Sequence, residues 1–256
     1  MQPVMPPYIF GIIMFVGMLV MLEVGRMVAL RHNETEQERT SLGTIEAAVF
    51  ALFGLLIAFT FSGAASRFQE KRMMIAEEAH TVESAYMRID LVAPSAQPRL
   101  REEFREYVDS RLEIYHRLPD MNAAHFAIER TRKLQLLIWK DAIAATRISY
   151  DDPAGSRLLL PAVTDMIHLS RTRMMGIQNH PPGLIYVLLL GLGWLCSLLA
   201  GFRMATARRH WLYMLTFPLV TAAIVFLTID TEYPREGLIR LDQADQMLRD
   251  VRARMD

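Results

Sequence analysis

The residue types that most often carry catalysis or bind metals are present in this chain, but they form no recognisable pattern. The seven histidines never occur at the close spacing of a helical metal site. Asp151 and Asp152 lack the glycine and glutamate spacing of a calcium loop, so they indicate a turn. Phosphate-binding glycine loops and nucleophile motifs do not occur. We therefore expect no catalytic residue, no metal and no cofactor, and we predict that the protein is not an enzyme.

Three acidic residues stand out because they lie inside or beside strongly apolar stretches. Glu46 is near the start of one such stretch, and Asp230 and Glu232 come just after another. A carboxylate at these places is costly to bury and often faces water, an ion or a partner. We predict that these three residues are polar or ion-contacting sites. Helix capping and solvation explain Asp230 and Glu232 equally well.

Four apolar stretches surround these acidic residues and predict the architecture. Each is close to the roughly 20 residues that a helix needs to cross a bilayer. Alternation typical of β-strands is missing from the sequence. The chain is thus predicted to be a multi-pass protein of the cell (inner) membrane, all-α, with four transmembrane helices in two hairpins and a helical soluble domain between spans two and three. The stretches are Tyr8–Leu30, Gly43–Ala65, Leu184–Phe202 and Trp211–Ile229.

Composition agrees with a lipid bilayer as the main environment. The 256 residues carry 28 basic and 28 acidic side chains, so no basic field exists to drive nucleic-acid binding. The single cysteine, Cys196, lies within an apolar stretch, which excludes a disulfide framework. Arginine counts on the two sides differ too little to fix the orientation, although they slightly favour the short hairpin loops inside.

The chain divides into four segments on this basis. We expect a first transmembrane hairpin over 1–66, a soluble helical domain over 67–183, a second hairpin over 184–229 and an amphipathic tail over 230–256. The second span has no proline before Pro94, which predicts one continuous helix from about 43 to 92 that leaves the bilayer. Further helices are expected at 98–118, 122–149 and 156–178, and in the tail from about Leu241.

The second span carries the strongest candidates for a function. Its end is rich in small residues, which allow helices to approach closely. If several copies surrounded an axis, either of two apolar stripes could line a narrow path, and apolar constrictions gate pores by excluding water. Packing against lipid and the other spans explains the same residues. The first stripe is Ala51, Leu55 and Phe59, and the second is Phe53, Ile57 and Phe61.

Three blocks of sequence resemble the bestrophin-like family of bacterial membrane proteins, a family described as a domain of unknown function. The first block runs from Glu46 to Ala64 and continues through Arg67-Phe68 to Glu77-Glu78-Ala79. The second is Asn179-His180-Pro181-Pro182, and the third extends from Pro234 to Leu241. The resemblance covers essentially the whole chain.

A remote similarity to the true bestrophins, which are pentameric anion channels, follows from this resemblance. It implies a pore lined by the second helix, a cytoplasmic helical domain and an apolar neck at Ala51, Leu55 and Phe59. Alanine at position 51 replaces a bulky neck residue, which implies a wider constriction. The calcium-binding acidic segment of bestrophins is reduced here to Asp230 and Glu232, which does not favour calcium gating.

Two functional hypotheses follow. The first is a homo-oligomeric ion channel, a pentamer if it is bestrophin-like, that passes small inorganic anions along the second span. The alternative is a non-conducting membrane scaffold or sensor whose helical domain binds a protein partner.

Overall fold

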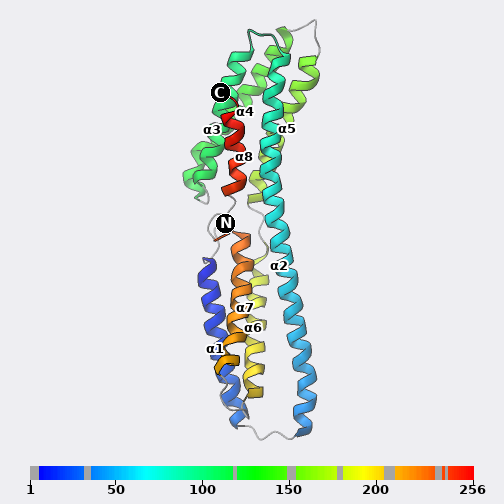
Figure 1. Ribbon diagram of the computed structural model, residues 1–256, viewed down its shortest axis with the longest axis vertical. Helices are drawn as coiled ribbons and strands as arrows, with labels where there is room; N and C mark the ends of the chain where they lie inside the picture. The colour runs from blue at the N-terminus through cyan, green and yellow to red at the C-terminus, as the bar shows by residue number, and fades with distance from the viewer. Residues whose placement is uncertain are drawn as a thin grey trace. The chain divides into compact units, whose positions relative to one another are not determined.

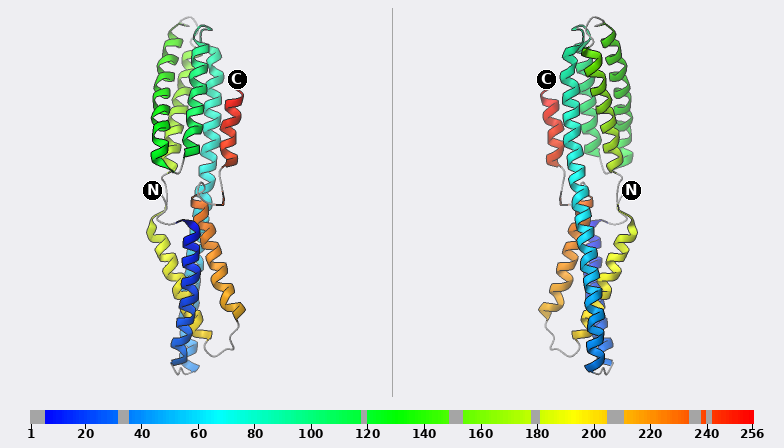
Figure 2. Two further views of the ribbon diagram at one scale, coloured as in Figure 1. Left: turned by 90° about the vertical axis from the view of Figure 1, so that its left-hand side faces the viewer. Right: turned by 90° about the vertical axis from the view of Figure 1, so that its right-hand side faces the viewer.

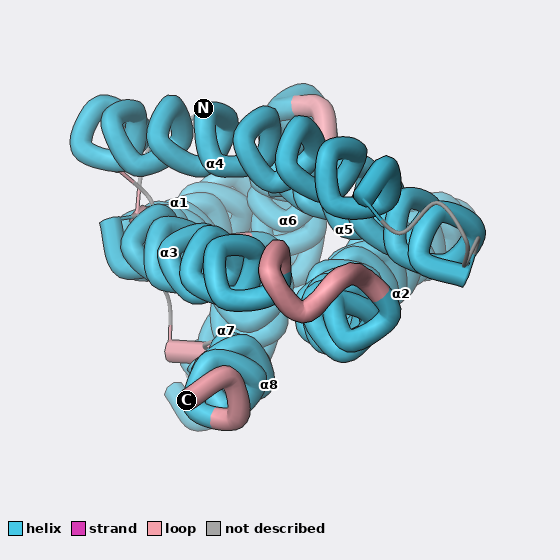
Figure 3. Tube along the Cα trace, turned by 90° about the horizontal axis from the view of Figure 1, so that it is seen from above, coloured by secondary structure: helices cyan, strands magenta, loops and turns pink. Residues whose placement is uncertain are grey.

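The computed structural model describes residues 6–31, 36–117, 120–148, 154–177, 181–204, 211–233, 238–239 and 242–256. Within these ranges every regular element is helical, which confirms the all-α class (Figure 3). Four helices in the described part of the chain are long and apolar enough to cross a bilayer, as predicted. The elements are α1 (Pro7–Arg31), α2 (Glu36–Met87), the 3₁₀ helix η1 (Arg88–Leu91), α3 (Gln97–Arg117), α4 (Met121–Ile148), α5 (Ala154–Ile177), α6 (Gly183–Arg203), α7 (Trp211–Glu232) and α8 (Asp242–Ala253) (Figure 1).

The chain forms two compact units. The first contains Met1–Phe68 and His180–Ile239, and the second contains Gln69–Asn179 and Arg240–Asp256. The finer division into four segments stays a prediction. In the first unit α1 packs against both α6 and α7. Its buried residues include Met14 and Met18 of α1 and Cys196 of α6.

Glycines bring α1 and α6 unusually close together. A Cβ atom added at Gly25 would lie 1.9 Å from the carbonyl oxygen of Leu198. One added at Gly201 would lie 1.9 Å from the carbonyl oxygen of Leu22. Because both contacts are with backbone, a larger residue could enter only by moving one helix away from the other. The two helices therefore pack backbone to backbone, as small residues permit between membrane helices.

Helix α2 continues without interruption from the first unit into the second. It spans 52 residues, and η1 then tightens its last turn before Pro94. The long helix expected from about 43 to 92 is thus confirmed, with an earlier start at Glu36. Within the second unit a single face of α2 is buried. Its Ala79 and Val82, followed by Ile89 of η1, belong to the core of that unit.

The second unit is a helical bundle. Its α3 packs against α4, and α4 packs against α5. The core contains Phe104 and Tyr107 of α3, Ile138 of α4 and Met166 of α5, all fully buried. Amphipathic periodicity explains the arrangement, because each helix places apolar residues on the side that faces its neighbours.

The tail helix α8 packs on this same unit (Figure 2). Its Leu248 and Val251 enter the core, while Arg252 Nε donates to Asp109 Oδ1 at 2.9 Å. The hydroxyl of Tyr86 donates to the carbonyl of Met255 at 3.0 Å. An amphipathic tail can pack on its own subunit or on a neighbouring one. In this structure the tail packs on its own chain.

Candidate functional site

The membrane segment of α2 has an open face that carries the first stripe of candidate residues. Leu55 is 52% exposed and Phe59 68% exposed, and Ala51 is exposed beside them. A Cβ atom added at Gly54 would meet nothing within 4 Å. Only 11% of the residues in the most apolar stretch of α2 are buried within the chain, whereas 44% are buried in the corresponding stretch of α7. Among the described residues, none covers this side of α2.

The second stripe is divided between the inside and the outside of the unit. Phe53 is only 3% exposed and belongs to the core of the first unit, and Ile57 packs against that core. Phe61, in contrast, is 46% exposed. Phe53 and Ile57 thus hold α2 against its own neighbours, so the stripe does not form one surface.

Glu46 is placed at an interhelix ion pair. Arg203 Nε, at the end of α6, donates to Glu46 Oε2 at 2.5 Å. The Arg203 guanidinium also fills the space beside Gly43, where an added Cβ would be 2.3 Å from its Nη2. The carboxylate predicted to face water or a partner therefore has a partner within the chain, and the pair ties α2 to α6.

Asp230 is buried and bonded to backbone. Its two carboxylate oxygens accept from the N–H of Leu238 at 2.9 and 3.0 Å, and Oδ2 also accepts from the N–H of Ile239 at 2.9 Å. Charge-assisted bonds of this kind compensate for the burial of a carboxylate. Asp230 thus binds the backbone of Leu238 and Ile239.

Glu232 is also buried, and it bonds to a cation of α2. Arg67 Nε donates to Glu232 Oε1 at 2.7 Å. Arg67 belongs to the first of the three sequence blocks that carry the family resemblance. The contact joins the end of α7 to the end of the membrane segment of α2 and leaves the open face of α2 uncovered.

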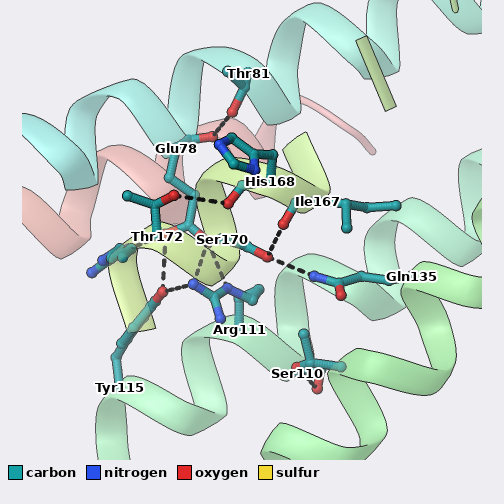
Figure 4. Close-up of polar contacts among 12 residues, drawn as sticks. Glu78, Thr81, Ser110, Arg111, Tyr115, Gln135, Ile167, His168, Ser170 and Thr172 are labelled. Atoms are coloured by element: carbon teal, nitrogen blue, oxygen red, sulfur yellow. Dashed lines mark hydrogen bonds and ion pairs between the residues drawn. The ribbon is translucent and has the colours of Figure 1, made fainter. Parts of the chain in front are cut away.

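A charged cluster inside the second unit did not emerge from the sequence. Glu78 of α2 is fully buried, and Arg111 Nε of α3 donates to its Oε1 at 2.6 Å (Figure 4). The hydroxyl of Tyr115 donates to Glu78 Oε2 at 2.9 Å, and Arg173 of α5 also pairs with Oε2. The Arg173 guanidinium carbon lies 3.7 Å from the Tyr115 ring centroid, a cation–π contact. One carboxylate thus joins three helices.

The electrostatics of this cluster keep its donors in place. Burial raises the pKa of the Tyr115 phenol far above its ordinary value, so the group stays a neutral donor. Burial lowers the pKa of Arg111, but the Glu78 carboxylate together with Tyr115 and Tyr107 more than offsets this effect, and the net shift is upward. A signal in the sequence was available: Glu78 lies three residues after Ile75 and four before Val82, on the apolar face of the helix.

A second acidic site joins α3 to α4. Arg99 Nε donates to Glu103 Oε1 at 3.1 Å, and Arg99 Nη2 lies 2.6 Å from Asp141 Oδ2. One guanidinium thus holds two carboxyl groups together. Burial, and then the hydrogen bond with Asp141, raise the pKa of Glu103 to about 7. The pair is therefore poised to share one proton near neutral pH. Among the described residues, no three metal-ligating side chains come together.

With this geometry established, comparison with known proteins places the chain. A family model described as the Bestrophin-like domain matches residues 11–245. The chain belongs to the Bestrophin-like family. Among curated proteins, none gives a significant sequence match.

Solved structures of a bacterial Bestrophin homolog from Klebsiella pneumoniae have a similar fold. One variant of that protein matches with a TM-score of 0.65 at 14% identity, covering 94% of this chain and 98% of its own. A second gives 0.63 at 14% identity over the same shares, and a third gives 0.62 at 15% identity, again over 94% and 98%. At such identities the likeness shows the fold alone. This Bestrophin-like chain is thus a membrane protein with that fold.

Proposed function

We propose that this Bestrophin-like protein is a homo-oligomeric ion channel and that copies of α2 line its conduction path. The observation that carries the proposal is the open face of α2. In a single chain this face exposes Leu55 and Phe59, although the other side of the same helix is packed through the buried Phe53. An asymmetry of this kind suits a helix that has protein on one side and a lumen on the other.

Lipid alone does not explain the open face. Met73 and Met87, in the portion of α2 that belongs to the second unit, are 69% and 63% exposed. They follow a charged segment that includes Glu70, Lys71 and Arg72 and that is unsuited to the hydrocarbon region. Exposed apolar residues thus continue along α2 beyond the stretch that lipid can cover, which supports contact with further copies or a lumen.

The first stripe is the proposed constriction. Ala51, Leu55 and Phe59 are exposed at successive helical turns, so one of each from every copy would form stacked apolar rings. Phe53 and Ile57 are assigned to packing. The resemblance to pentameric anion channels makes five copies the expected number and small inorganic anions the expected ions.

Conductance is the direct test. Purified protein in planar bilayers is expected to give unitary currents, and Phe59→Ala is expected to change their size because it removes the largest side chain of the stripe. Phe126→Ala is the matched control, since Phe126 of α4 is 72% exposed and lies in the second unit. Silence over a wide range of voltages, together with a monomeric particle, contradicts the proposal.

One observation favours the alternative, a scaffold or sensor. Along α4, Phe126, Leu137 and Ile148 are exposed at intervals of eleven residues, close to three helical turns. Exposed Lys133 and Lys140 lie between them. An apolar and basic helix face of this kind suits an acidic helical partner. Recovery of a stoichiometric acidic partner that Phe126→Ala releases, from protein that carries no current, would favour this reading.

A further inference from the structure

Within the second unit, α2 carries a stripe of acidic and apolar residues that its own chain leaves largely exposed. The residues follow one another at spacings of three and four, which place them on one helix face. Met73 and Met87 are 69% and 63% exposed, and Glu77 is exposed without an ion pair to any described residue. Exposed methionines beside carboxylates suit contact with another protein surface. This acidic stripe consists of Glu70, Met73, Glu77, His80, Ser84 and Met87.

Helix α4 carries a basic counterpart in the same unit. Its residues repeat the spacings of three and four, and all of them are exposed. Lys133 and Lys140 form no ion pair with any described residue, whereas both acids of α4, Glu129 and Asp141, already pair with arginines. Most of the positive charge on this face is therefore left without compensation by the described residues. This basic stripe consists of Arg130, Lys133, Leu137, Lys140, Ala144 and Arg147.

We propose that the acidic stripe of one copy packs against the basic stripe of a neighbouring copy, so that the second units join head to tail. This inference rests on the homo-oligomer of the proposed function and names the surfaces that join it. Each stripe extends over almost five helical turns, about 26 Å at 1.5 Å per residue, so the two match in length as well as in charge. Two basic stripes would repel each other, which disfavours a two-fold pairing. A head-to-tail contact can instead close into a ring.

Glu77 sets the register of this contact. On the basic stripe, Lys133 and Lys140 lie one turn to either side of Leu137. A Glu77 placed opposite Leu137 can accept from both ammonium groups, whichever way the two helices run. The methionines of the acidic stripe then lie against the aliphatic stems of basic side chains. Phe126 lies one turn before Arg130, outside the matched length. The charges thus select the partner face, and the apolar groups between them exclude water.

Cysteine pairs test the contact in membranes under mild oxidation. The double variant Glu77→Cys/Leu137→Cys is expected to give a ladder of disulfide-linked dimers, trimers and larger species, because every copy is then linked to two neighbours. Each single variant is expected to stay monomeric, since equivalent positions do not meet in a head-to-tail contact. Glu77→Cys/Glu102→Cys is the matched control and is expected to stay monomeric, because Glu102 is an exposed residue of α3 in the same unit.

Charge reversal supplies a second measurement that needs no disulfide. Glu77→Lys places a third cation beside Lys133 and Lys140, so the concentration at which the oligomer dissociates in detergent is expected to rise roughly tenfold or more. Glu77→Lys/Lys140→Glu is expected to recover most of this loss, because opposite charges face each other again. Glu102→Lys is the control and is expected to leave the oligomer unchanged. Particle masses over a dilution series measure all three variants.

The outcomes separate this contact from the channel. Monomers from Glu77→Cys/Leu137→Cys, dimers from Glu77→Cys alone, or a loss that Lys140→Glu does not recover overturn the contact, and unitary currents from the same protein leave the channel standing. A stoichiometric partner of another sequence that Lys140→Glu releases also overturns the contact, because that partner then occupies the basic stripe. A ladder and a recovered oligomer from protein that carries no current support the contact and overturn the channel.

Discussion

At the scale of single residues, buried carboxyl groups hold the second unit together, and they do so in two different ways. Glu78 is surrounded by cationic and neutral donors and stays ionised, whereas Glu103 lies beside a second carboxyl group and competes with it. The chemistry of a buried acid thus depends on its neighbours more than on burial itself. Each case leads to a distinct expectation.

Replacing Glu78 is expected to cost far more stability than replacing a surface acid. Glu78→Gln leaves Arg111 and Arg173 buried without their carboxylate, which is expected to cost about 3–5 kcal/mol. Glu83→Gln is the control, because its pair with Arg254 is partly exposed and such pairs are worth about 0–1 kcal/mol. Chemical denaturation of the protein in detergent measures both. Similar losses for the two variants would show that the cluster does not anchor the unit.

Glu103 is expected to make stability depend on pH in the neutral range. Its pKa rises from 4.5 to about 7 on folding, so between these values the folded state binds more protons than the unfolded state. The contribution of Glu103 therefore falls as pH rises from 4.5 to 7, by about 1–2 kcal/mol after allowance for solvent screening. Glu103→Gln cannot titrate, so it is expected to flatten this region of the curve and to stabilise the protein above pH 7.

Thermal unfolding midpoints measured at intervals from about pH 5 to about pH 8 provide the comparison. Glu102→Gln, one residue earlier and largely exposed, is the control and is expected to keep the wild-type slope. A Glu103→Gln variant whose midpoints follow the wild-type curve would mean that burial and Asp141 do not raise the pKa of Glu103.

At the scale of helices, the sequence predicted the elements well and their partners poorly. Apolar length and the lack of proline are local properties, so the four spans and the long α2 helix could be inferred directly. The partners of Glu78 come from two other helices, and those of Asp230 are backbone N–H groups that any residue except proline would offer. Such contacts depend on tertiary packing, which periodicity does not encode. The sequence also could not distinguish exposed Phe59 from buried Phe53, because each of them lies on an apolar stripe.

The contact between α1 and α6 provides a prediction at this scale. Gly201→Ala is expected to cost about 1–3 kcal/mol, because its new methyl group would meet the backbone of Leu22 and force the helices apart. Gly191→Ala, on the same helix, meets nothing within 4 Å and is expected to be neutral or slightly stabilising. Thermal stability in detergent compares the two. Equal effects of the two alanines would contradict the close crossing.

At the scale of the whole molecule, the open face of α2 is the feature that a single chain leaves unexplained. A long helix that is packed on one side and exposed on the other is suited to surrounding an axis with copies of itself, and this arrangement brings equivalent residues together across that axis. A lipid-facing helix does not bring its equivalent residues together. Proximity between copies therefore distinguishes a lumen-lining α2 from a peripheral one without any measurement of current.

Cysteine cross-linking measures that proximity. The native Cys196 is the chain's single cysteine and is buried, so one added cysteine supplies the exposed thiol. Leu55→Cys is expected to give disulfide-linked dimers on mild oxidation in membranes, because equivalent residues near an axis approach the roughly 4–7 Å between Cα atoms that a disulfide requires. Leu219→Cys, at a position of α7 that is 58% exposed, is the control and is expected to stay monomeric. Dimers from Leu219→Cys without dimers from Leu55→Cys would move the axis from α2 to α7, and the assignment of the apolar stripe would fail with it.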